Sequence, residues 1–101
     1  MKISVIIVTY NRSILCNRLL QSLEKQTVKP FEVIVIDDHS IKPFHPIKKY
    51  SFPLILIRNK RELGLAASRN IGIKRAKGDV LAFIDDDALP FKDWLCSIKK
   101  N

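Results

Sequence analysis

This 101-residue chain has little of what marks disulfide-rich or membrane-spanning proteins. Its two cysteines, Cys16 and Cys96, lie far apart among apolar neighbours. We predict that both are small buried hydrophobic residues in a reducing compartment, not a disulfide or a metal pair. Its apolar runs are shorter than the roughly 20 residues of a membrane helix. The first run, residues 3–8, has no small-residue cleavage site after it and predicts a strand rather than a signal peptide.

The sequence also lacks the usual signals of nucleic-acid binding. It carries 18 lysines and arginines against 10 acidic residues, for a net charge of +8, which favours an anionic partner. Nucleic acid, anionic lipid and phosphorylated small molecules all meet that description. Because there is no arginine-rich run and no aromatic-basic RNA motif, we predict no nucleic-acid partner. The charge is compatible with a cytoplasmic protein that associates peripherally with the inner face of a membrane.

The composition predicts one globular domain over residues 1–101. Hydrophobic residues make up 47% of the chain and charged residues 28%, which is ordinary for a protein with a buried core. No repeat, low-complexity tract or linker divides it. Four uninterrupted apolar runs rich in β-branched residues are typical of strands buried on both faces of a parallel sheet. They are residues 3–8, 33–36, 54–57 and 80–84.

The segments between these runs predict three helices. Leucines at helical spacing indicate a helix over residues 14–23, with Asn11 or Ser13 as its N-cap. A second helix is predicted over residues 65–76, with Gly78 as its C-cap. Pro90 is predicted to open the third, which carries Trp94, Leu95 and Ile98. The proline-rich stretch 38–53 predicts an irregular connection with at most a short helix at 47–50.

This order of elements predicts an α/β fold. We expect an open three-layer sandwich, Rossmann-like, with about four strands in a mainly parallel sheet and three helices. In such a sheet the C-terminal ends of the strands meet at one edge, where ligands bind next to a reversal of strand order. The polar residues that follow the strands should converge there. They are Thr9–Asn11, Asp37–Ser40, Arg58–Asn59 and Asp85–Asp87.

The run Asp85-Asp86-Asp87 is the strongest chemical signal. Side chains alternate along a strand, so Asp85 and Asp87 are predicted to point the same way from its end. Adjacent carboxylates disfavour one another's ionisation unless a positive charge lies among them, and a hard divalent cation would supply it. A solvated acidic turn before Pro90 is the alternative. With an aromatic ring and several cations nearby, the edge suits a nucleoside diphosphate compound whose leaving diphosphate is held by a metal.

Five segments, in this order and spacing, resemble the N-terminal nucleotide-sugar-binding half of the family 2 glycosyltransferases, which have the GT-A fold. They are Ser4–Arg12, Gln26–Thr27, Glu32–Ser40, Gly64–Gly72 and Ile84–Asp87. The resemblance covers nearly the whole chain. It implies transfer of a sugar, with inversion, from a nucleoside-diphosphate sugar, first of all a UDP-sugar, to a glycan or lipid-linked acceptor.

The resemblance also implies roles for single residues in donor binding. Asp38 would accept a hydrogen bond from a base edge and Arg69 would meet the base or the diphosphate. The residues around the base and ribose would be Val8, Thr9, Tyr10 and Asn11, with the Tyr10 ring against the base. The alternatives are a ring that caps the core for Tyr10, a cap or turn residue for Asp38, and a surface residue for Arg69.

The acidic run corresponds to the family's Asp-X-Asp motif. Asp85 would approach the ribose and metal-bound water, and Asp87 would bind the Mn²⁺ or Mg²⁺ that bridges the diphosphate. Asp86 occupies the variable middle place and is counted among the donor-binding residues. Two positions depart from the family: Ala88 stands where many members have a further acid, and His39 where they often have glycine or asparagine.

The general base of the family lies beyond this motif, in the half that builds the acceptor site. We therefore expect residues 1–101 to be a C-terminally truncated donor-binding part with little or no transfer activity alone. Its open sheet edge would be available to further strands or to a second copy of the chain. Two other classes of function stay open. One is a receiver-like phosphoacceptor domain, suggested by Asp37-Asp38, and the other is a non-catalytic nucleotide-binding or assembly module.

Overall fold

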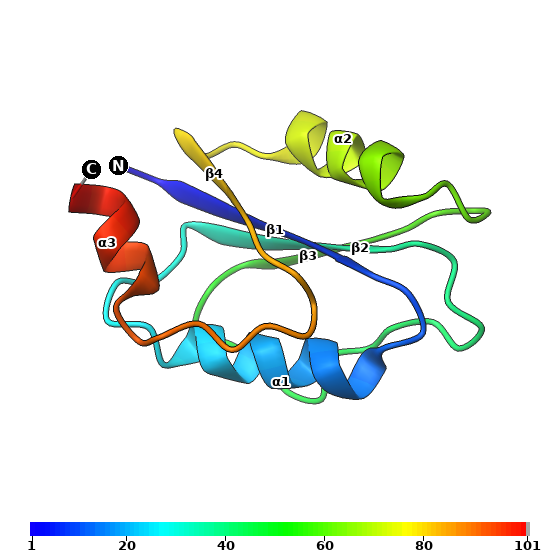
Figure 1. Ribbon diagram of the computed structural model, residues 1–101, viewed down its shortest axis with the longest axis horizontal. Helices are drawn as coiled ribbons and strands as arrows, with labels where there is room; N and C mark the ends of the chain where they lie inside the picture. The colour runs from blue at the N-terminus through cyan, green and yellow to red at the C-terminus, as the bar shows by residue number, and fades with distance from the viewer. Residues whose placement is uncertain (101) are drawn as a thin grey trace.

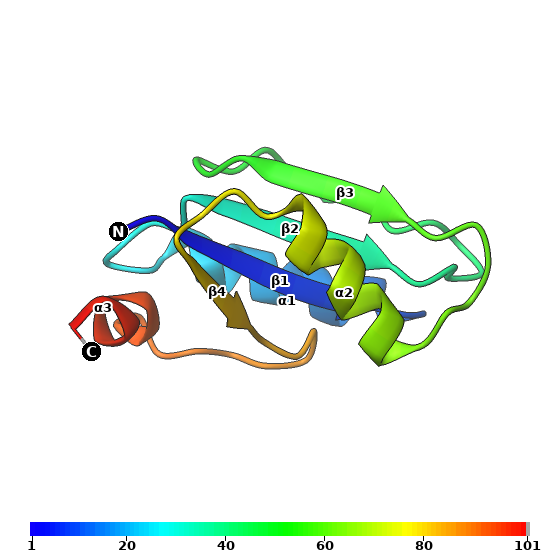
Figure 2. The same ribbon diagram turned by 90° about the horizontal axis from the view of Figure 1, so that it is seen from above.

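A computed structural model describes residues 1–100 as a four-stranded sheet covered by helices on both faces (Figure 1). The strands are β1 (Ile3–Thr9), β2 (Glu32–Asp37), β3 (Leu54–Arg58) and β4 (Val80–Phe83). They lie in the order β3-β2-β1-β4, which Figure 2 shows from above, and every neighbouring pair is parallel. The predicted α/β class and the parallel sheet are confirmed.

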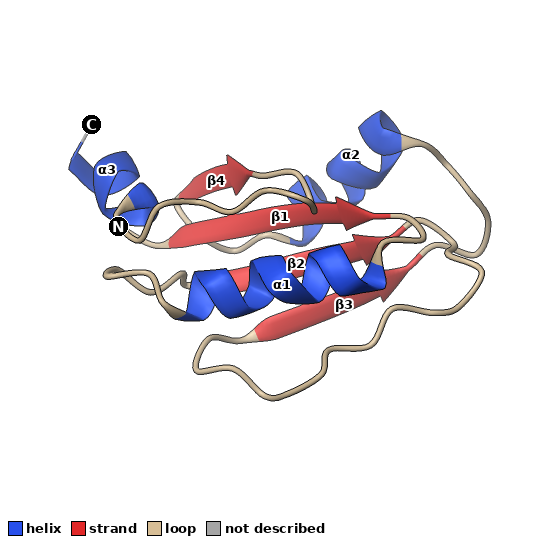
Figure 3. Ribbon diagram, turned by 60° about the horizontal axis from the view of Figure 1, so that its bottom comes forward, coloured by secondary structure: helices blue, strands red, loops and turns tan. Residues whose placement is uncertain are grey.

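The helices form the two outer layers of the sandwich. Helix α1 (Ser13–Glu24) and helix α3 (Trp94–Lys100) lie on one side of the sheet, and α2 (Leu65–Arg75) lies on the other (Figures 1 and 3). Alternation along β1 decides which residue meets which layer. Val5 and Ile7 pack with the leucines of α1, whereas Ile6 packs on the face covered by α2. The uninterrupted apolar strands therefore fill two cores.

The strand order places a topological switch between β1 and β4. The chain runs from β1 outward through β2 to β3, and then crosses back to place β4 on the other side of β1. Parallel sheets bind ligands at the C-terminal ends of the strands that flank such a reversal of strand order, which here are β1 and β4. This is the edge at which Thr9 and the run Asp85–Asp87 emerge.

Several predicted boundaries were wrong, and hydrogen bonds from distant segments explain them. Helix α3 begins at Trp94 rather than at Pro90. Gln26 donates its side-chain amide to the Phe91 carbonyl, and the Thr27 N–H bonds to the carbonyl of Lys92. These carbonyls would otherwise accept the first bonds of the longer helix. Strand β4 ends at Phe83, one residue before its predicted end.

Two predicted helix caps are also absent from residues 1–100. Arg12 is the N-cap residue of α1, without a side-chain hydrogen bond, and Ser13 is already helical. Asn11 does not cap because its side-chain oxygen accepts the Ile41 N–H. Residues 47–50 are not helical. Of the two cysteines, Cys16 is buried as predicted, but Cys96 is only half-buried.

Gly78 is not the C-cap of α2, which ends at Arg75 with Ala76 in an extended conformation. Instead, Gly78 lies against the start of β1 and its N–H donates to Ser4 Oγ at 2.9 Å. The same hydroxyl donates to the buried Glu32 carboxylate at 2.6 Å. A Cβ at residue 78 would lie 2.7 Å from the Lys2 carbonyl oxygen and 2.9 Å from the Ser4 nitrogen.

We therefore expect Gly78→Ala to lower the free energy of unfolding by about 2 kcal/mol, because backbone atoms of β1 and β4 must separate. Chemical denaturation measures this. Gly64→Ala is the comparison: a Cβ there would meet open space, but Gly64 has a φ of 93°. Its cost should come from the strained positive-φ backbone alone, about 1 to 3 kcal/mol, with no clash against β1. A Gly78→Ala chain as stable as the unchanged chain would contradict this account of the contact.

Candidate functional site

Two adjoining cavities lie at the switch edge. The first, which we call the Tyr10 cavity, has a volume of about 290 Å³. Its lining consists of Val8, Tyr10, Arg12, Asp38, Glu62, Gly64, Leu65 and Asp86. The second, the Asp85 cavity, has a volume of about 230 Å³. Its lining consists of Ile6, Val8, Arg12, Leu65, Arg69, Ile84, Asp85, Asp86 and Asp87. The two cavities share Val8, Arg12, Leu65 and Asp86, so they form one continuous site.

The carboxylates of the acidic run do not all face the same way. The Ala88 N–H donates to the Asp85 carbonyl, so the chain turns immediately after β4. Asp86, in the variable middle place, points inward and accepts the Thr9 hydroxyl at 3.0 Å. Asp85 and Asp87 are exposed, with 75% and 52% of their side chains accessible. The strand alternation predicted for Asp85 and Asp87 does not apply, because β4 ends at Phe83 and a turn carries the acidic run, but both residues line the Asp85 cavity.

Arginines supply positive charge among these carboxylates. Arg12 Nη1 lies 3.4 Å from both Asp86 Oδ1 and Asp87 Oδ2. Arg69 Nη2 lies 3.8 Å from Asp85 Oδ1, and its guanidinium stacks over the Phe83 ring at 5.7 Å. No role was predicted for Arg12. Its place directly after the Thr9–Asn11 segment was the available signal, but 75 residues separate it from Asp87.

Burial raises the pKa of Asp86, against hydrogen bonding from Thr9 and the positive charge of Arg12. Because the folded-state pKa lies above the unfolded value, ionised Asp86 lowers stability at neutral pH. That loss is absent below the unfolded pKa and grows as the pH rises through the folded-state value.

We accordingly expect Asp86→Asn to increase the free energy of unfolding at pH 7 by roughly 1 kcal/mol or less, because the amide keeps an acceptor for Thr9 without the buried charge. Unfolding measured between pH 3 and pH 7 should show the difference shrinking toward acid. Asp93→Asn, at an exposed acid remote from the site, is the control. A difference independent of pH would contradict this assignment.

Asp38 lies at the wall of the Tyr10 cavity but is only 4% exposed. Its carboxylate accepts the Asn59 side-chain amide at 2.9 Å and the N–H groups of Leu63 and Gly64 at 2.8 and 2.9 Å. Burial alone would raise its pKa, but these hydrogen bonds outweigh it and hold the pKa below the ordinary value. Asp38 therefore fixes the segment that leads into α2.

The remaining predicted residues emerge from the end of β1. Thr9 is buried, Val8 is half-buried and contributes to both cavities, and the Tyr10 ring is 41% exposed in its cavity. Asn11 has a φ of 54°, and its backbone and side chain bond to Ser40 and Ile41. It lines a third, mainly apolar cavity of about 530 Å³ instead of the two that contain Asp38 and Asp85.

His39, which follows Asp38 in the sequence, is a turn residue. It has a φ of 66°, and its Nδ1 lies 3.1 Å from the Asn59 carbonyl oxygen. It lines neither the Tyr10 cavity nor the Asp85 cavity. His39 and Asp38 therefore both contact Asn59, at the start of the segment between β3 and α2.

Comparison with known proteins identifies the family of this chain. The model of the family described as Glycosyl transferase family 2 matches residues 4–100. The chain belongs to this family. An uncharacterized glycosyltransferase of Haemophilus influenzae is 46% identical over 85 residues, which are 84% of this chain and 29% of that protein. The family membership confirms the resemblance and displaces the receiver-domain alternative.

Solved structures of glycosyltransferases share the fold. TarS residues 1–349 of S. aureus, in complex with UDP-GlcNAc, superimposes with a TM-score of 0.83 at 29% identity, over 99% of this chain and 30% of that one. The mannosyltransferase PcManGT of Pyrobaculum calidifontis, in complex with GDP-Man and Mn²⁺, gives a TM-score of 0.84 at 27% identity, over 98% and 31%. The family 2 chain described here thus spans under a third of these proteins.

Proposed function

We propose that this family 2 chain binds a nucleoside-diphosphate sugar, with a UDP-sugar as the first candidate. This sugar would be the donor of an inverting glycosyl transfer to a glycan or lipid-linked acceptor. The observation that carries the proposal is the pair of continuous cavities at the switch edge. One offers an aromatic ring and Asp38, which suit a base, and the other offers carboxylates and arginines, which suit a metal-bound diphosphate. The TarS complex with UDP-GlcNAc supports a donor of this class.

Different residues of this chain are assigned to different parts of the donor. We assign the base and ribose to Val8, Thr9 and Tyr10 with Asp38, and the diphosphate to Arg69 and Arg12. Asn11 lines the third cavity and would support this segment through its bond to Ile41 rather than meet the donor. Both arginines line the Asp85 cavity beside its carboxylates, so their guanidinium groups lie next to the space assigned to the diphosphate. Asp86 would hold the end of β1 in place through Thr9 while the donor binds.

Asp85 and Asp87 fit a divalent cation by their chemistry. Mg²⁺ is commonly bound by one or two carboxylates together with substrate phosphates, and both of these carboxylates line the Asp85 cavity. Among residues 1–100, no three acidic, histidine or cysteine side chains form a group that could hold an ion. When bound, Mn²⁺ or Mg²⁺ would act as a Lewis acid on the diphosphate. The PcManGT complex with GDP-Man and Mn²⁺ supports such a cofactor.

Thermal unfolding tests the proposal. At a concentration near 100 times its dissociation constant, UDP with Mn²⁺ should stabilise the chain by about 2.7 kcal/mol, raising the melting temperature by roughly 10 °C or more. Mn²⁺ alone should give little shift, because its ligand set includes the diphosphate. GDP in place of UDP tests the choice of base.

The Asp87→Ala chain should lose the metal-dependent part of that shift, since it lacks one of the two proposed ligands. Asp93→Ala removes an exposed acid outside both cavities and should respond like the unchanged chain. A shift in melting temperature that does not depend on the metal, or that is equal in the Asp87→Ala and unchanged chains, would contradict the donor-site assignment. Nucleotide binding is the measurement, because the residues assigned in this chain concern the donor.

A further inference from the structure

The net charge of +8 is not spread evenly over the molecule. At the end that carries the site, seven basic residues face six acidic ones, so the two signs nearly balance. The basic residues are Arg12, Arg18, Lys42, Arg58, Lys60, Arg61 and Arg69, and the acidic ones are Asp37, Asp38, Glu62, Asp85, Asp86 and Asp87. Arg18 belongs to this group because its guanidinium donates to the Asp87 carbonyl at 3.3 Å. Lys48, Lys49, Lys74 and Arg75 lie outside both ends as defined here. The excess positive charge therefore lies away from the site.

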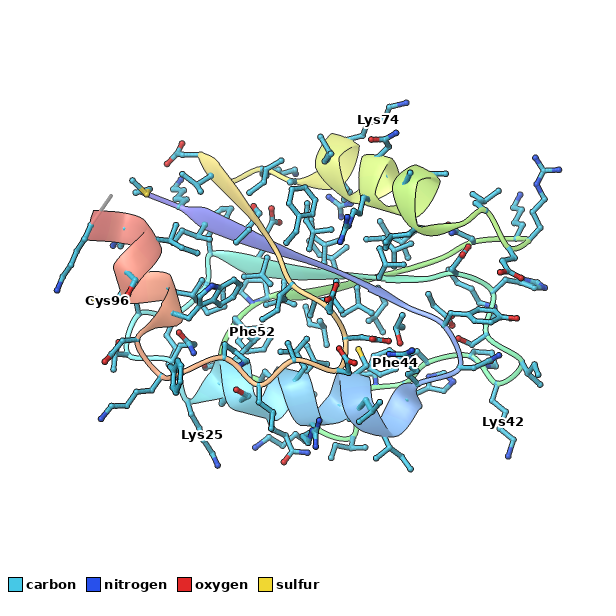
Figure 4. The ribbon with its side chains drawn as sticks, viewed as in Figure 1. Lys25, Lys42, Phe44, Phe52, Lys74 and Cys96 are labelled. Carbon is cyan, nitrogen blue, oxygen red and sulfur yellow. The ribbon has the colours of Figure 1, made fainter. Side chains whose placement is uncertain are left out.

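The opposite end, at the N-terminal ends of the strands, has seven basic residues and four acidic ones. We call its basic residues the lysine pole: Lys2, Lys25, Lys29, Lys77, Lys92, Lys99 and Lys100. All seven are exposed. The fold brings them together because α1 ends here, close to α3 and to the starts of β1 and β4 (Figure 1). In Figure 4, Lys25 lies near this end and Lys42 near the other, whereas Lys74 of α2 lies above the middle of the molecule.

The four acidic residues at this end are occupied by bonds of their own. Glu32 is buried against Ser4, and Asp79 accepts the Lys2 N–H at 2.9 Å. Glu24 binds Ser51 and pairs with Lys29, and Asp93 accepts the Thr27 hydroxyl at 3.1 Å. Most of the seven cations consequently face solvent.

The kind of cation also differs between the ends. Five of the seven basic residues near the site are arginines, whose planar forks suit phosphates bound in fixed geometry. All seven basic residues of the lysine pole are lysines, which act as compact point charges on flexible stems. The Phe31 ring at this end is covered by Lys2 Nζ at 5.0 Å, so its face is not open for stacking on a base. These features favour a diffuse anionic surface over nucleic acid.

We propose that the lysine pole docks the protein on a bilayer of anionic phospholipid, with the donor site turned away from the surface. The molecule is 38 Å long, whereas charges are screened over about 8 Å at physiological salt. The pole therefore does not act on the nucleotide, and docking is independent of the proposed donor binding.

Flotation with vesicles tests this. The chain should bind phosphatidylcholine vesicles that contain phosphatidylglycerol, should not bind vesicles of phosphatidylcholine alone, and should be released by high salt. The triple variant Lys25→Gln, Lys77→Gln, Lys99→Gln removes three cations of the pole that make no ion pair among residues 1–100. Its affinity for the anionic vesicles should fall by about tenfold or more.

The matched control is Lys42→Gln, Lys60→Gln, Arg61→Gln, which has the same net charge but is altered at the site end. Its vesicle affinity should stay within about twofold of the unchanged chain, because these charges lie far beyond the screening length. Both triple variants should keep the response to UDP and Mn²⁺ if the donor proposal holds. Absence of vesicle binding, equal losses in the two variants, or tighter binding to RNA than to anionic vesicles would each overturn the docking proposal.

Discussion

A chain in which Asp37 is replaced by alanine is expected to lose about 3 kcal/mol of its free energy of unfolding. The Asp37 carboxylate is buried and accepts the Ser40 N–H at 2.9 Å, the Ser40 hydroxyl at 2.6 Å and the Phe44 N–H at 2.9 Å. It also pairs with Arg58 at 2.8 Å across the β2–β3 boundary. Removing it leaves buried donors without an acceptor, which is why the loss should be large.

Thermal melting should show a decrease of roughly 12 to 24 °C for a domain of this size. Glu62→Ala removes an equivalent charge from an exposed position and should change stability by less than about 0.5 kcal/mol. Asp37→Asn retains one acceptor and should fall between the two. An Asp37→Ala chain that melts with the unchanged protein would contradict this reading of the contacts.

The acid dependence of stability follows from the same carboxylate. Burial alone would raise the pKa of Asp37, but hydrogen bonds from Ser40, Phe44 and Arg58 outweigh it and hold the pKa below the ordinary value. Its contribution is therefore complete above the unfolded-state pKa and is lost as the pH falls through the folded-state value. Below about pH 4, the unchanged chain should lose stability more steeply than Asp37→Asn.

The second large effect is expected for Asp38→Ala, which should lower both stability and nucleotide affinity. The carboxylate holds Asn59, Leu63 and Gly64, and the Asn59 amide also donates to Ser68 of α2 at 3.0 Å. Its removal frees the segment that positions α2, so we expect a loss of roughly 2 to 3 kcal/mol in unfolding free energy. Affinity for UDP with Mn²⁺ should fall at least about tenfold, as for a lost charged hydrogen bond.

The neighbouring aspartates form a matched pair for this experiment. Asp37 faces the β2–β3 connection and lines neither donor cavity, whereas Asp38 lines the Tyr10 cavity. At a temperature where both variants are folded, calorimetry should find near-normal nucleotide affinity for Asp37→Ala and weak binding for Asp38→Ala. Equal affinities in the two variants would show that Asp38 is a structural turn residue and nothing more.

Much of the fold could be predicted because it depends on local pattern. The runs around Val5 and Val33 are apolar without interruption, and only strands covered on both faces explain such runs in a short globular chain. Leucines such as Leu19 and Leu23 recur at the spacing of one helix face. The start of α3 could not be predicted, because Pro90 is a good first helical residue until Gln26 and Thr27 take the carbonyls of Phe91 and Lys92.

The sequence by itself determined that the acids and polar residues after each strand would meet at one edge, because the apolar runs predict parallel strands and parallel strands end at the same edge. Only the tertiary structure decided the strand order β3-β2-β1-β4 and what each acid does at that edge. Asp86 turns inward to Thr9, Arg12 stands among the carboxylates, and Asp38 is committed to the segment before α2. These outcomes depend on contacts between residues up to 77 positions apart. Local propensity carries no information about such contacts, since burial and the available hydrogen-bond partners are set only when the layers pack.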